Sequence, residues 1–237
     1  MIGRVILAAL LAGVAAGFIM GVIQHFKLTP LILEAEVFET AGPAGHSHET
    51  TTAAEPAAPG AAEPEEWAPQ DGWQRTLYTT AASMFAGAGF AAVLAGIALL
   101  TGVPLTARNG LLWGIAGFIS VNLAPAMGLS PELPGTPAAE LLSRQIWWVG
   151  TIIATGLAIY LIAIKREYWA IAAAVALIIA PHLIGAPQPP THESGVPAGL
   201  AAEFAANSIA AAAAFWCIIG VFAGIALDRT TKGMWAT

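Results

Sequence analysis

Six long apolar runs without a single charged residue constrain this chain more than any other feature of its sequence. An uncharged run of about 18 residues is long enough to cross the hydrocarbon core of a membrane as a helix. Only 10% of the 237 residues are charged, whereas soluble domains carry about 25%. The sequence therefore predicts an all-α, polytopic membrane protein in a single domain of residues 1–237. The predicted spans are 5–26, 77–100, 111–129, 146–164, 168–184 and 204–227.

Basic residues near the span ends predict the orientation, because cytoplasmic loops carry an excess of Lys and Arg. With the N-terminus in the cytoplasm, every base except Lys27, Arg75 and Arg144 falls on the inner side. Six spans return the C-terminus to the cytoplasm, next to Arg229 and Lys232. We therefore expect an N-in, C-in protein of a bacterial inner membrane, surrounded by the lipid bilayer.

This orientation gathers groups that attract cations on the outer side. All acids except Glu167 and Asp228, and all five histidines, fall there. An acidic surface raises the local concentration of cations through its field. Residues 40–70, rich in Ala, Pro, Glu, Gly and Thr, predict a flexible outer loop with too little apolar surface to fold. Within this loop, His46 and His48 precede Glu49 and form a weak chelating cluster, unless they are incidental polar residues of a solvated loop.

The first span ends in a histidine that continues a row of glycines. Gly13, Gly17 and Gly21 recur every four residues, and such a row allows a neighbouring helix to approach closely. His25 is the next position, so we expect it to face a helix and not lipid. The acids Glu34, Glu36 and Glu39 follow.

The fifth span ends with Pro181 and His182. Proline removes a backbone hydrogen bond from a helix, and irregular backbone at this depth is tolerated where it is buried in protein or lines a cavity. The short link 165–167 predicts that the fourth and fifth spans are antiparallel neighbours. Trp147 and Trp148 open the fourth span and are typical of an interfacial belt.

Imidazole, carboxylate and amide groups together form a ligand set that suits divalent transition metals, whereas copper(I) prefers sulfur. We expect Co²⁺ as the substrate, with Ni²⁺ or Zn²⁺ as alternatives, and no organic cofactor. The predicted metal ligands are His25, His182, Glu34, Glu36, His46, His48 and His192. The predicted pathway residues are Gln24, Asn122, Gln188, Glu203 and Asn207.

Motifs of several enzyme classes are missing from the sequence. It contains no phosphate-binding loop of the GxxxxGK[ST] type and no GxSxG, HExxH or CxxC motif. No basic face indicates nucleic-acid binding. We therefore expect a protein that is not an enzyme and does not bind nucleic acid.

Four ordered blocks resemble the CbtA family of membrane proteins, proposed subunits of a cobalt transporter. The blocks are PLILEAEVFE at 30–39, LAPAMGLSPELPG at 123–135, RQIWW at 144–148 and APHLIGAPQP at 180–189. The resemblance implies cobalt uptake linked to cobalamin supply, together with a small, histidine-bearing partner subunit of one span.

The expected function is therefore a membrane subunit of a divalent-metal uptake transporter, with a site at the outer face where the metal enters. Either a single chain or a homo-oligomer is compatible with the sequence. Two alternatives stay open at this point. One is an electron-transfer protein that holds haem between His25 and His182. The other is a scaffold that transports nothing and whose histidines only anchor helices.

Overall fold

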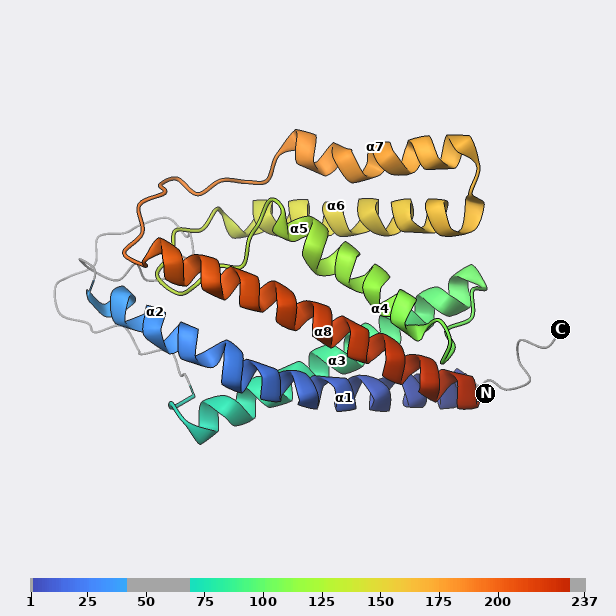
Figure 1. Ribbon diagram of the computed structural model, residues 1–237, viewed down its shortest axis with the longest axis horizontal. Helices are drawn as coiled ribbons and strands as arrows, with labels where there is room; N and C mark the ends of the chain where they lie inside the picture. The colour runs from blue at the N-terminus through green and yellow to red at the C-terminus, as the bar shows by residue number, and fades with distance from the viewer. Residues whose placement is uncertain (1, 42–68, 231–237) are drawn as a thin grey trace, which may run out of the picture.

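The structure, a computed structural model, describes residues 2–41 and 69–230, and every regular element in this part of the chain is helical. The helices form an elongated bundle (Figure 1). In chain order they are α1 (Ile2–Lys27), α2 (Thr29–Ala41), α3 (Trp73–Thr101), α4 (Gly110–Phe118), η1 (Ile119–Leu123), α5 (Ala124–Ala126), α6 (Leu141–Tyr160), η2 (Leu161–Lys165), α7 (Tyr168–Ile184) and α8 (Ala198–Thr230). The predicted all-α membrane fold is confirmed.

Each predicted span coincides with an apolar helix. Four helical segments have the length and composition to cross a membrane: Gly3–Lys27, Trp73–Thr101, Leu141–Lys165 and Ala198–Thr230. Two shorter apolar segments, Gly110–Ala126 and Tyr168–Ile184, occupy the third and fifth predicted spans. The third span ends before its predicted limit at residue 129, because Gly128 donates its backbone N–H to the carbonyl of Pro125 in a turn. Helix α1 begins and α8 ends at the same end of the bundle (Figure 1), as an even number of spans requires.

Helix α2 continues from α1 after a short break at Leu28 and was not predicted. Backbone hydrogen bonds from Leu28 to Gln24 and from Ile32 to Leu28 carry the helical pattern across the junction. Pro30 is the second residue of α2, where its missing N–H and fixed φ suit a first helical turn. The apolar span α1 is therefore followed directly by a second helix, α2, which carries the acids Glu34 and Glu36.

Glycines join α1 to α3 at very close range. A Cβ added to Gly13 would lie 2.1 Å from the carbonyl oxygen of Gly87, and one added to Gly17 would lie 2.2 Å from that of Ser83. Gly21 lies in the same way against Thr80. The glycine row therefore does what its spacing predicts, since only glycine permits this approach of two backbones.

A second close contact joins α4 to α8. Gly110 faces Gly220, and Gly114 faces the backbone of Trp216. The Trp216 ring covers Gly117 and stacks at a tilt on Phe90, with ring centroids 4.7 Å apart. Because α8 also packs against α1 and α3, its buried face forms much of the core, around residues such as Ile219 and Ala223.

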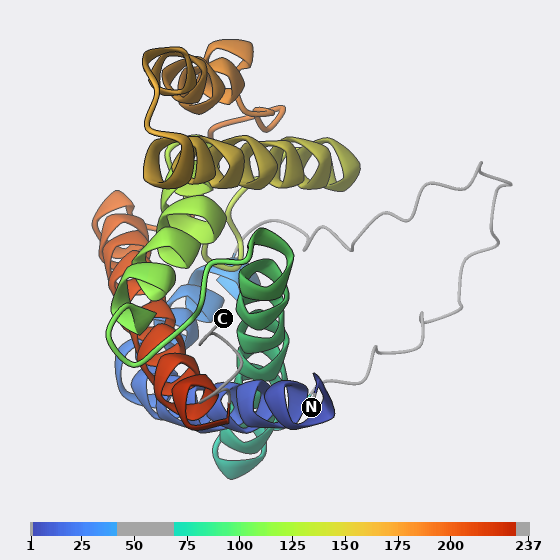
Figure 2. The same ribbon diagram turned by 90° about the vertical axis from the view of Figure 1, so that its right-hand side faces the viewer.

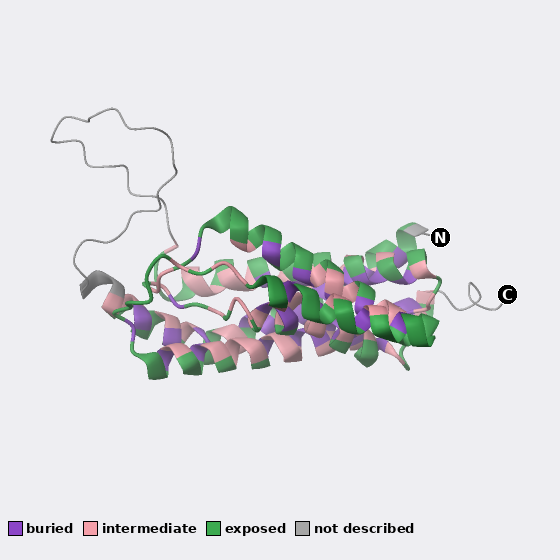
Figure 3. Ribbon diagram, turned by 90° about the horizontal axis from the view of Figure 1, so that it is seen from above, coloured by how far each residue is buried: buried purple, intermediate pink, exposed green. Residues whose placement is uncertain are grey.

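Helices α6 and α7 form a hairpin on one side of this bundle (Figure 2). The link 165–167 turns through Arg166, the one non-glycine residue with positive φ (55°) in the described part of the chain. The two helices pack against each other, so the predicted antiparallel pair is confirmed. Large apolar side chains on α7 are exposed, as Leu183 and Ile184 show at 81% each, and exposed positions run along the outer helices (Figure 3). Such a face suits lipid.

Candidate metal site

Nearly all the predicted ligands that the structure describes lie at one end of the bundle. We call it the α2 end: α2 lies at this end of the bundle, where α1 and α7 end and α3, α6 and α8 begin (Figure 1). Gln24 and His25 are in the last turn of α1, Glu34 and Glu36 are in α2, and His182 is in the last turn of α7. Gln188 and His192 lie in the connection 185–197, Glu203 and Asn207 near the start of α8. His46 and His48 lie outside the described residues.

The structure does not bring His25 and His182 together. Helix α1 packs against α2, α3 and α8, whereas α7 packs against α6 and η2, and the two helices lie on different sides of the bundle (Figures 1 and 2). His25 and His182, both predicted as metal ligands, therefore lie in the last turns of two helices that do not adjoin each other. One haem held between them has no support in this arrangement either.

His25 faces α3 as predicted. Its Nδ1 lies 3.2 Å from Oγ1 of Thr76, which in turn donates to the carbonyl of Gly72. This contact extends the glycine row by one step toward the α2 end. His25 is exposed, and its ring meets that of Phe26 edge to face, with centroids 4.9 Å apart.

The two predicted acids of α2 have different surroundings. Glu34 is exposed. Glu36 accepts from Nη1 of Arg75 at 2.7 Å, and Nε of the same guanidinium lies 2.9 Å from Asp71. Arg75 therefore fastens α2 to the start of α3, and Glu36 is already paired with a cation.

His182 belongs to a packed corner between α6 and α7. Its ring meets Trp147 edge to face, with centroids 5.9 Å apart. The indole Nε1 of Trp147 donates to the carbonyl of Pro181 at 3.0 Å. Trp147 is buried and also covers Gly128, so the prediction that it lies in an interfacial belt is wrong. It packs against the last turn of α7, next to the proline that lies inside this helix.

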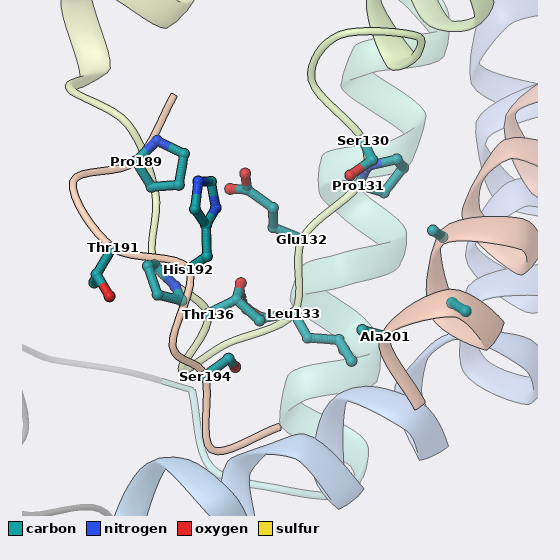
Figure 4. A pocket seen from close by; sticks show the side chains of 13 residues that line it. Ser130, Pro131, Glu132, Leu133, Thr136, Pro189, Thr191, His192, Ser194 and Ala201 are labelled. Carbon is teal, nitrogen blue, oxygen red and sulfur yellow. Dashed lines mark hydrogen bonds between the residues drawn. The ribbon is translucent and has the colours of Figure 1, made fainter. Parts of the chain in front are cut away.

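The described part of the chain has a cavity of about 340 Å³ at the α2 end (Figure 4). Its walls come from the connection between α5 and α6, the connection between α7 and α8, and the first turns of α8. Its polar side chains are Ser130, Glu132, Thr136, Thr191, His192 and Ser194. Of the predicted ligands, only His192 lines it.

His192 and Glu132 face each other in this cavity, and the imidazole and the carboxylate point toward one another (Figure 4). Oε2 of Glu132 also lies 2.9 Å from Nη2 of Arg144, which belongs to the first turn of α6. Sequence reasoning did not select Glu132 as a ligand. The sequence feature that could have pointed to Glu132 is the proline-rich block at 123–135, in which it lies between Pro131 and Leu133.

The predicted pathway residues make hydrogen bonds in several separate parts of the bundle. Gln24 accepts from Ser83 at 2.7 Å, and Asn122 in η1 accepts from Nε1 of Trp216 at 2.7 Å. Asn207 donates to the backbone carbonyl of Glu203. Gln188 donates to the carbonyl of Ala186.

Within residues 2–41 and 69–230, no group of three or more His, Cys, Asp or Glu side chains could hold a metal ion. The cavity thus offers one imidazole and one carboxylate, a pair that suits a divalent transition metal which keeps part of its water. Six waters occupy roughly 180 Å³ at about 30 Å³ each. A hydrated cation therefore fits a cavity of about 340 Å³.

These features define a polytopic helical membrane protein with an imidazole and a carboxylate facing each other in a cavity at one end. Comparison with known families gives a match over nearly the whole chain: the family described as "Probable cobalt transporter subunit (CbtA)" matches residues 2–228. The chain belongs to this family. No match was found among curated proteins or among solved structures.

Proposed function

We propose that this chain is the membrane-embedded subunit of a divalent-metal importer, with Co²⁺ as its preferred substrate, and that the metal enters at the α2 end from the outer side of a bacterial inner membrane. Membership of the family supports cobalt transport by an assembly in which this chain is one subunit. The small histidine-bearing partner that the resemblance implies belongs to this proposal.

The observation that carries the site is the cavity in which His192 and Glu132 face each other. The imidazole supplies a nitrogen ligand and the carboxylate an oxygen ligand. Both groups are at least partly accessible, since His192 is exposed and the Glu132 side chain is 31% exposed. A hydrated divalent cation exchanges one or two waters for these groups and keeps the rest.

Predicted ligands outside this cavity attract the metal ion without binding it directly. Glu34 and the exposed imidazole of His25 lie at the same end of the bundle, where their charge and donor atoms raise the local concentration of cations. The proposal assigns the first direct contact with the metal to His192 and Glu132, and an electrostatic role to the acids of α2.

Uptake by the purified full chain in proteoliposomes tests the proposal. Internal metal is followed with a Co²⁺-sensitive dye, and Ni²⁺ and Zn²⁺ are added as competitors. We expect His192→Ala and Glu132→Gln to lower the rate about tenfold. Lys27→Gln removes a charge at the same end but outside the cavity, and should leave the rate unchanged.

Equilibrium Co²⁺ binding by the same samples separates binding from transport. If neither binding nor uptake depends on His192, the proposal is wrong. Binding without uptake by the chain alone means that a partner subunit is needed for passage. In intact cells, metal uptake that is unchanged in His25→Ala, His182→Ala and His192→Ala would favour the scaffold alternative.

A further inference from the structure

Two of the three bases on the predicted outer side are held by acids. Arg75 bridges Glu36 and Asp71, and Arg144 pairs with Glu132. The Arg144 pair differs from the other in one respect, because its acid is the carboxylate that lines the cavity with His192. The cation closest to the proposed metal ligand is therefore part of the chain itself.

A guanidinium and a divalent metal compete for the same carboxylate. Both bind to the carboxylate oxygens of Glu132, and their like charges repel each other when they are a few ångströms apart. The Arg144 and Glu132 side chains are 29% and 31% exposed, and pairs that reach solvent contribute little net stability. A cation of higher charge can therefore displace Arg144 without a large loss to the fold.

We propose that Arg144 occupies the metal-binding carboxylate of the empty protein as a tethered substitute cation, which the incoming metal must displace from Glu132. This inference rests on the proposed function of the cavity. It assigns Arg144 a role in specificity: a monovalent ion gains no electrostatic advantage over the guanidinium, whereas a divalent ion does.

The connectivity gives this exchange a structural consequence. Arg144 lies in the first turn of α6, whereas Glu132 lies in the connection before it, twelve residues earlier. The ion pair thus ties the cavity wall to the α6–α7 hairpin. When a metal takes the carboxylate, this tie is released, while the hydrogen bond between Trp147 and Pro181 keeps the hairpin itself together.

Calorimetric titration of CoCl₂ into the full chain in lipid nanodiscs tests the inference. We expect Arg144→Gln to tighten Co²⁺ binding about tenfold, equivalent to about 1.4 kcal/mol. Arg144→Lys keeps the competing charge and should stay within twofold of the wild type. Lys27→Gln removes one positive charge at the same end but away from Glu132, and should also stay within twofold. His192→Ala in the Arg144→Gln background should abolish the gain.

The outcomes separate this inference from the proposed function. If the wild type binds Co²⁺ through His192 and Arg144→Gln binds equally or more weakly, Arg144 only supports Glu132 and the inference falls alone. If Lys27→Gln tightens binding as much as Arg144→Gln, the effect is general surface charge and the inference also falls. If no variant binds Co²⁺ through His192, both proposals fall together. Circular dichroism of each variant shows whether it is folded.

Discussion

The indole Nε1 of Trp147 donates to the carbonyl oxygen of Pro181 at 3.0 Å, and the same carbonyl also accepts from the backbone N–H of Gly185. This double acceptor lies where α7 ends, next to His182. The hydrogen bond from Trp147 connects the start of α6 to the end of α7. The hairpin is therefore held at one end by its link 165–167 and at the other end by the buried Trp147 side chain.

Trp147→Phe should therefore lower the stability of the hairpin. The substitution retains most of the apolar ring but removes the indole N–H, and one such hydrogen bond contributes about 1 kcal/mol. Thermal unfolding in detergent should show a lower Tm for Trp147→Phe. Trp148→Phe changes the exposed neighbour and serves as the matched control, with an unchanged Tm. Equal effects of the two substitutions would mean that the hydrogen bond contributes nothing.

The close approach of α1 and α3 leads to a second prediction. A Cβ at Gly87 would lie 2.2 Å from the carbonyl oxygen of Gly13, whereas one at Gly89, two residues later on the same helix, would meet nothing within 4 Å. Gly87→Ala should destabilise the protein by about 2 kcal/mol, in the range measured for overpacked cores. Gly89→Ala should be neutral or slightly stabilising, because alanine favours helix. Denaturant or heat titration of both variants in one detergent measures the difference, and a stable Gly87→Ala variant would contradict the helix contact.

Features that depend on distance along a helix could be predicted from the sequence. The apolar runs predicted the four long and two shorter apolar helical segments. The glycine spacing predicted the α1–α3 contact, and the next step of that row placed His25 against α3, where it meets Thr76. The short link 165–167 predicted the α6–α7 pair. In each case, one helical period or one loop length determined the outcome.

Features that depend on position around the bundle could not be predicted in this way. His25 and His182 each end a predicted span on the outer side, but this leaves open where each lies around the bundle axis, and α1 and α7 do not pack on each other. Glu132 and His192 face each other because two connections that are about 60 residues apart in the chain meet at one end of the bundle. No helical period links these two positions in the sequence. Trp147 looked like a belt residue because composition alone does not reveal that Pro181 supplies its acceptor.

Two measurements can decide whether Asn122 has a structural role or lies on the metal pathway. Its Oδ1 accepts from Nε1 of Trp216 at 2.7 Å across two helices. A double-mutant cycle with Asn122→Ala and Trp216→Phe should give a coupling energy of about 1 kcal/mol in thermal unfolding, as expected for residues in one hydrogen bond. If Asn122 also contacts the metal on its way, Asn122→Ala should lower Co²⁺ uptake more than Trp216→Phe at matched protein levels. Equal uptake in the two variants would assign Asn122 a structural role.

Glu140, the N-terminal cap of α6, predicts a pH dependence. Its carboxylate accepts from the hydroxyl and backbone N–H of Ser143 and from the backbone N–H of Leu142. These bonds, with the Ser143 side chain first, lower the pKa of Glu140 in the folded protein. A lowered folded pKa means that the cap stabilises α6 fully above the unfolded value of about 4.3. The stabilisation is then lost as the pH falls through the lower folded value.

Glu140→Gln should therefore have a lower Tm than the wild type at pH 7, with a difference that shrinks as the pH falls from about 5 toward 3. Glu34→Gln changes an exposed carboxylate of α2 and is the control, because its difference from the wild type should not follow this pattern. A Tm difference for Glu140→Gln that stays constant over the whole range would show that its charge is not what caps α6. Since α6 carries Arg144 in its first turn, a loosened cap should also weaken the hold of Arg144 on Glu132. Co²⁺ binding by Glu140→Gln at pH 7 should then be tighter than that of the wild type.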